Sequence, residues 1–100
     1  MTNKVFWIVI ITLSIISCKK SKFESDYFKL SHDGKNREYL LHKPNNFEQQ
    51  TEKSLVIALH GGVGTPKNIE EQSLLSEVSD VEGFLVCYPE GFKRTWNAGR

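Results

Sequence analysis

The sequence predicts an α/β fold in which a β-hairpin is followed by a strand–helix–strand unit. Two predicted strands, at residues 54–60 and 84–88, contain continuous apolar runs, at 55–59 and 84–88, as strands covered on both faces do. A stretch with helical spacing separates them. Because a strand, a helix and a second strand in close succession form a right-handed βαβ unit, we expect the two apolar runs to lie parallel in one sheet.

The predicted hairpin occupies residues 26–43. Residues 26–32 alternate loosely between apolar and polar, and Asp33, Gly34, Lys35 and Asn36 form a favourable turn before a second strand at residues 37–43. Pro44 is expected to end that strand. The polar stretch at residues 45–53 is then a surface loop.

The predicted helix lies between the two apolar runs. Asn68 can cap its start, with Glu71 returning a capping-box contact, and Gly83 has the place of a C-terminal cap. The apolar side chains expected on its buried face are Leu74, Leu75, Val78 and Val81.

The first residues have the pattern of a bacterial lipoprotein signal peptide at 1–17. Lys4 precedes twelve mostly apolar residues, 5–16, which are too few to cross a bilayer, since a spanning helix needs about twenty. The following Ser17 and Cys18 resemble the end of a lipobox, so Cys18 is the expected lipidation site and residues 18–25 a polar tether. An ordinary secretory signal and an uncleaved anchor remain the alternatives.

Charge and cysteine content exclude some classes of function. The chain has 13 Lys and Arg residues against 12 Asp and Glu residues, and no clustered basic stripe that would indicate nucleic-acid binding. If Cys18 carries lipid, Cys87 is alone in an apolar run and is expected to be a buried free thiol, although a disulfide to a residue beyond position 100 stays open.

No metal site or cofactor is predicted. His32, His42 and His60 have no second histidine or cysteine at the spacing that metal ligands require.

The most informative feature is the glycine-rich turn at residues 61–64, directly after the first apolar strand. Such a turn can present bare backbone amides, and donors at the carboxyl end of a strand can stabilise the oxyanion of an acyl-transfer reaction. The expected donors are the amides of Gly62 and Val63. A plain strand-to-helix turn or a phosphate site is the alternative, but a Walker loop is excluded because no Gly-Lys-Ser/Thr follows.

Three segments together resemble a known enzyme family. His60, Gly61 and Gly62 are similar to the oxyanion loop of α/β-hydrolases. With residues 82–91 and 96–100 in this order, the stretch 39–100 resembles the amino-terminal part of the polyhydroxybutyrate depolymerase and feruloyl esterase-like hydrolases. The implied fold is an incomplete hydrolase sheet at residues 26–100, truncated before the nucleophile elbow, with one edge of the strand at 54–60 left unpaired.

The resemblance implies carboxylic-ester hydrolysis through an acyl-serine intermediate, without a cofactor. Suitable substrates are hydroxyalkanoate oligomers or feruloylated polysaccharide. No serine lies in a Gly-x-Ser-x-Gly motif, so the nucleophile, acid and base are expected outside these residues, and the segment alone should be inactive. His60, Gly61 and Gly64 would support the loop. The family usually has glycine at position 63.

Two further residues are candidates for the cleft wall. Glu90 follows the second apolar strand and Trp96 lies shortly after it, where loops gather at the carboxyl end of parallel strands. A plain turn residue and a packing anchor are the alternatives for these two positions.

Other functions are compatible with the same sequence features. The complete protein could be a peptidase or an acyltransferase of the same fold, a non-catalytic lipoprotein that binds carbohydrate or peptide, or an inactive truncated product. In the preferred interpretation it is attached to the cell envelope, outside the cytoplasm, by a lipid at Cys18, with an ester or polymer as substrate.

Overall fold

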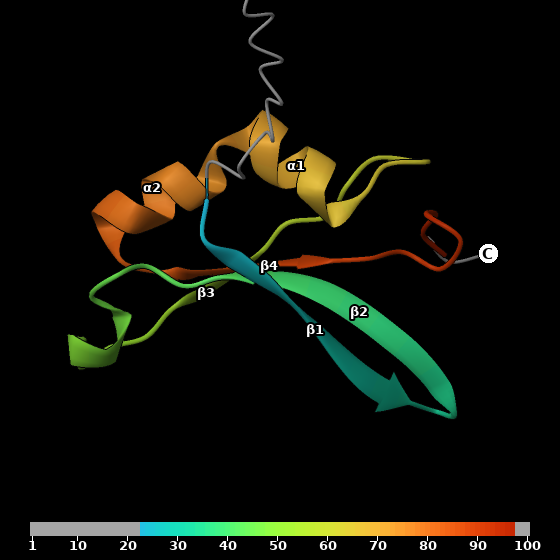
Figure 1. Cartoon of the computed structure of the whole chain (residues 1–100), viewed down its shortest axis with the longest axis horizontal. Helices are drawn as coiled ribbons and strands as arrows, with labels where there is room; N and C mark the ends of the chain where they lie inside the picture. Colours follow the sequence, from blue (N-terminus) through green and yellow to red (C-terminus); the bar gives the residue numbers. More distant parts are fainter. Residues whose placement is uncertain (1–22, 98–100) are drawn as a thin grey trace, which may run out of the picture.

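A computed structural model describes residues 23–97, which form a mixed four-stranded sheet and two helices (Figure 1). The sheet has the order β1-β2-β4-β3, and α1 and α2 both lie on one of its faces (Figure 1). The α/β class predicted from the sequence is confirmed at this level. The signal peptide and Cys18 lie outside the described residues.

The predicted hairpin is confirmed. Strand β1 (Ser25–His32) pairs antiparallel with β2 (Lys35–His42). The connecting residues Asp33 and Gly34 have φ angles of 52° and 70°, as a two-residue hairpin turn with matching twist requires. The polar tether expected at residues 18–25 is too long at its end, however, because Phe23 is buried and Ser25 is the first residue of β1.

The parallel strand pair is also confirmed. Strand β3 (Leu55–Ile57) pairs parallel with β4 (Leu85–Pro89), and the Ala58 amide extends the pairing to the Cys87 carbonyl. The prediction that β3 is covered on both faces is wrong. Leu55 and Ile57 are 55% and 61% exposed, because β3 is the edge strand and both helices cover the opposite face.

The predicted single helix is two helices, α1 (Pro66–Ser73) and α2 (Leu75–Glu82). A short 3-10 turn, η1 (Phe47–Gln49), lies earlier in the chain, between β2 and β3. The cap is Thr65, whose hydroxyl accepts from the Asn68 amide, so Asn68 lies inside the helix. Pro66 explains this start, because proline is favoured in the first turn. Leu74 separates the helices with a left-handed φ of 56°.

This break rotates the faces of the helices. Leu74 and Val78 are each 45% exposed and Val81 is 80% exposed, so the predicted apolar face is wrong for these three residues. Leu75 does pack against the core. Three of the four fully buried helical side chains are polar, namely Glu70, Ser76 and Ser79, and the fourth is Pro66. Gly83 ends α2 with a φ of 83°, as predicted.

The core lies between the helices and the sheet. Leu40, Val86 and Tyr88 are its fully buried members, and four partly buried side chains pack against them: Ala58, Ile69, Leu75 and Phe84. The opposite sheet face carries a groove of about 640 Å³ lined mainly by apolar side chains, including Tyr39, Leu41, Leu55, Leu85 and Cys87.

Candidate functional site

The loop after β3 is centred on a buried histidine. The His60 side chain is 3% exposed; its Nδ1 lies 2.7 Å from the Gly61 carbonyl, and its Nε2 lies 3.0 Å from the Gly91 amide nitrogen. Since an amide only donates, Nε2 is the acceptor, and Nδ1 therefore carries the proton that it donates to Gly61. With both ring nitrogens occupied, His60 braces the loop and has no free nitrogen to act as a base.

A second turn, at residues 91–96, clamps this loop. The Trp96 indole donates to the His60 carbonyl at 2.7 Å, and the two rings lie 4.7 Å apart. Arg94 Nε donates to the Gly64 carbonyl at 3.2 Å. The 60–64 loop and the 91–96 turn thus form one hydrogen-bonded unit at the carboxyl ends of β3 and β4.

The two expected oxyanion donors have different surroundings. The Val63 amide donates to the Arg94 carbonyl at 2.9 Å, so it is occupied in this arrangement. The Gly62 amide has no acceptor among residues 23–97. Gly64 donates to the Gly61 carbonyl and closes the turn. Of the predicted pair, Gly62 is the donor open to a ligand.

Backbone strain is concentrated in the same unit. Val63, Lys93 and Arg94 have φ angles of 63°, 49° and 61°. This conformation is a genuine outlier for a β-branched residue, and such strain gathers at functional sites. A glycine at position 63, as in the resembled family, would adopt this φ without strain.

Glu90 and Trp96 line the apolar groove of the uncovered sheet face. Trp96 is at the same time a packing anchor through its contacts with His60, and its role as a cleft wall for substrate stays a prediction. Cys87 lines the groove as well. It is a free, half-buried thiol whose pKa is raised by burial.

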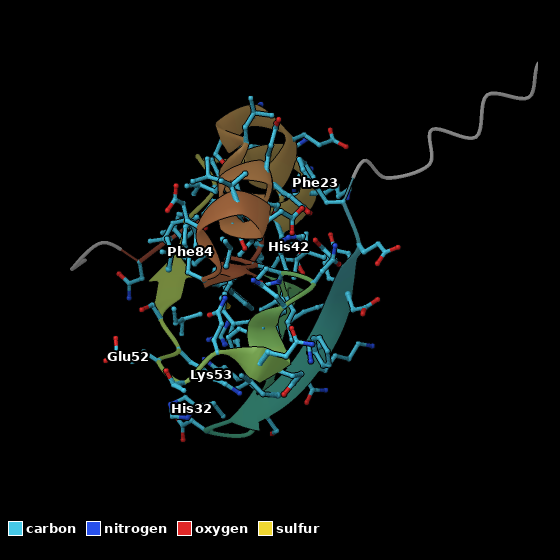
Figure 2. All side chains as sticks on the ribbon, turned by 90° about the vertical axis from the view of Figure 1, so that its left-hand side faces the viewer. Phe23, His32, His42, Glu52, Lys53 and Phe84 are labelled. Carbon is cyan, nitrogen blue, oxygen red and sulfur yellow. The ribbon has the colours of Figure 1, made fainter. Side chains whose placement is uncertain are left out.

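A polar network that no sequence pattern was taken to predict lies beneath the helices, around His42 (Figure 2). His42, 2% exposed, has Nδ1 3.1 Å from Ser25 Oγ and Nε2 2.8 Å from Asp80 Oδ1. Asp80 is 42% exposed and pairs with this histidine. Ser25 and Asp80 come from β1 and α2, so only the folded chain brings them to His42 on β2.

The network continues to Glu70, which is fully buried. Ser25 Oγ donates to Glu70 Oε1 at 2.5 Å, Ser76 donates to the same oxygen at 3.2 Å, and Ser76 is 2.8 Å from the Tyr88 hydroxyl. Since the Ser25 hydroxyl proton is directed at Glu70, His42 is not placed to remove it. The network therefore connects helices to sheet rather than activating a nucleophile. The alternation that places Leu40 and His42 on one face of β2 is the signal that indicates a buried His42.

The part of the chain from 23 to 97 holds no group of three or more His, Cys, Asp or Glu side chains arranged for a metal ion. Over the same residues, neither helix is long and apolar enough to span a membrane. In comparisons with known proteins, no protein-family model and no curated protein matches the chain.

Proposed function

We propose that this chain is the leading part of a lipid-anchored serine hydrolase that cleaves carboxylic esters, with the 60–64 loop providing an oxyanion donor. The observation that carries this proposal is the open Gly62 amide in a glycine loop at the carboxyl end of β3. The nucleophile, its base and the orienting acid belong to residues other than these, because no serine here lies in a Gly-x-Ser-x-Gly motif.

The clamp on the loop supports the proposed chemistry. An oxyanion donor is effective when it is aligned before the charge develops, and one such donor is worth about 3 kcal/mol in the transition state. His60, Arg94 and Trp96 hold the loop through hydrogen bonds to both sides. The Val63 amide would join the hole if an oxyanion replaced the Arg94 carbonyl as its acceptor.

The apolar groove fits the proposed acyl group. Its wall includes Leu41, Cys87 and Trp96, which suits an aliphatic or aromatic acid such as a hydroxyalkanoate or a ferulate. No cofactor is needed for this reaction. A lipid at Cys18 would hold the enzyme at the cell envelope beside a polymer that cannot enter the cell.

The test is a pair of substitutions at one position in the full-length protein. A Cβ at Gly62 meets nothing within 4 Å, so Gly62→Ala keeps both the shape and the amide. Gly62→Pro removes the amide and is expected to lower kcat on a p-nitrophenyl ester about 100-fold. Equal kcat for the two variants, both folded by circular dichroism, would refute the oxyanion role.

Labelling distinguishes the proposed enzyme from its rivals. A fluorophosphonate should label a serine of the full-length protein, whereas a non-catalytic binding lipoprotein or a truncated product stays unlabelled. Parallel assays on ester and amide substrates separate an esterase from a peptidase.

The proposed anchor has its own test. A palmitate analogue fed to cells should label the wild-type protein and the Cys87→Ala control. Cys18→Ala should abolish the label, and label that persists in that variant contradicts the lipid site.

A further inference from the structure

Cationic side chains of the hairpin and of the 91–95 turn gather in one region: Lys29 from β1, Lys35 and Arg37 from β2, and Lys93 and Arg94 from the turn. Three of them surround Phe92. Lys35 Nζ, Arg37 Cζ and Lys93 Nζ lie 6.0, 5.7 and 5.5 Å from its ring centroid. Phe92 itself is 60% exposed. A chain with a formal net charge of only +1 therefore concentrates positive charge at one place.

No charged nitrogen of these five side chains lies within 4 Å of a carboxylate oxygen of residues 23–97. The ion pairs in that part of the chain lie elsewhere and involve Lys43, Lys53, Lys67 and His42. Among the described residues, only two carboxylates, those of Glu38 and Glu90, line the cavity beside these cations. The cations therefore leave a local excess of positive charge, which a bound anion would offset.

The cluster borders a groove. Lys29, Arg37, Lys93 and Arg94 line a cavity of about 410 Å³ together with Phe92 and Asn36. The left-handed φ angles of Lys93 and Arg94 hold this part of the lining in a strained backbone, which is common where a ligand binds.

We propose that this groove binds an acidic polysaccharide, a chain of sugars that carry carboxylate or sulfate groups. The cations would pair with those acidic groups. Glu38 and Glu90 also line the groove, and their carboxylates, with the Asn36 amide, would accept hydrogen bonds from sugar hydroxyls.

The same two carboxylates argue against other polyanions. They repel any polyanion, but sugar hydroxyls between the acidic groups of a glycan could donate hydrogen bonds to them, whereas the closely spaced phosphates of a nucleic acid could not. A concave groove also fits a chain better than the flat surface of a membrane. The inference goes beyond ester cleavage and concerns binding alone, so it holds whether or not the protein is a hydrolase.

The groove is also connected to the glycine loop. Arg94 lines it and contacts both Gly64, through its guanidinium, and the Val63 amide, through its carbonyl. A glycan in this groove would therefore lie beside the loop proposed to carry the oxyanion donor.

The experiment measures binding of an oligogalacturonate to the full-length protein by calorimetry at low salt, with a neutral oligosaccharide of equal length as the comparison ligand. Arg37→Gln and Lys93→Asn should each weaken binding about tenfold. Asparagine tolerates the left-handed φ of position 93. Lys53→Gln removes a charge that also lies over an aromatic ring, Phe47, but outside the groove, and should leave the affinity unchanged.

The proposal is supported if the charged ligand binds, the neutral one does not, and only the two groove variants are weakened. Absence of binding, equal binding of the neutral ligand, or an equal effect of Lys53→Gln overturns it. Tighter binding to anionic vesicles or to single-stranded RNA than to oligogalacturonate would overturn it too. If Gly62→Pro leaves kcat unchanged while oligogalacturonate still binds at the groove, the oxyanion proposal fails and this inference stands.

Discussion

The indole Nε1 of Trp96 donates a hydrogen bond to the backbone carbonyl of His60 at 2.7 Å, from 36 positions further along the chain. This contact joins the two turns that follow β3 and β4. It satisfies a carbonyl of the glycine loop and positions the His60 ring against the indole.

Removal of this donor should loosen the loop. Trp96→Phe keeps an aromatic ring beside His60 but leaves its carbonyl without the indole, which is expected to lower the free energy of unfolding by about 1 kcal/mol. Urea unfolding followed by far-ultraviolet circular dichroism measures the loss. Trp96→Ala, which also removes the packing, should cost more; a Phe variant as stable as wild type would show that the hydrogen bond contributes nothing.

A glycine at position 63 should relieve strain. Val63 is 68% exposed, so Val63→Gly loses little packing, and relief of a left-handed β-branched residue outweighs the extra entropy of glycine in the unfolded chain. We expect a gain of about 1 kcal/mol in the free energy of unfolding. Val63→Ala keeps a Cβ and should gain less. A Gly variant less stable than the Ala variant would contradict the strain argument.

The polar network should be essential for stability. His42→Ala removes the partner of Ser25 and of Asp80 and leaves a hole under the helices, at an expected cost of about 3 kcal/mol. Asp80 is 42% exposed, so water compensates for part of its lost bond. His32, at the far end of the hairpin, is exposed (Figure 2). His32→Ala is the matched control and should change stability by less than about 0.5 kcal/mol; equal losses would argue against the network.

Stability should fall in alkaline solution through Tyr88. Burial raises the pKa of Tyr88 above its ordinary value of 10.0, and the charge of Glu70 adds to this, while the hydrogen bond with Ser76 opposes it. Because the folded-state pKa is the higher one, the contribution of this phenol is complete below pH 10 and is lost as the pH rises through the folded-state pKa. Urea unfolding between about pH 8 and 11 should therefore show a steeper decline in wild type than in Tyr88→Phe. Parallel curves would contradict this assignment.

The Cys87 thiol should react slowly. Burial raises its pKa above the ordinary 9.0, which lowers the thiolate fraction at pH 8. Iodoacetamide should alkylate the folded protein more slowly than the same chain in urea. A folded-state rate equal to the rate in urea would show an exposed thiolate.

Local signals in the sequence predicted part of the fold correctly. Asp33 and Gly34 predicted the hairpin turn because both adopt positive φ more readily than other residues do. Gly83 predicted the end of α2 for the same reason. The helix start was missed because Asn68 and Thr65 are both acceptable caps, and the proline at position 66 favours Thr65.

The place of the glycine loop after β3 was predicted, but the contacts that hold this loop were not. The glycine loop could be read from the residues alone, whereas the acceptor of the Val63 amide is the carbonyl of Arg94, whose approach depends on the turn after β4. The network of Ser25, His42 and Asp80 was missed because its members come from three different elements.

By itself, then, the chain's sequence determined where the strands and turns lie, because proline, glycine and runs of apolar residues act through the backbone within a few positions. The tertiary structure alone decided which polar groups are buried and which amides are occupied. Both depend on partners distant in sequence, and a buried donor or acceptor is stable only where packing brings such a partner within hydrogen-bonding distance.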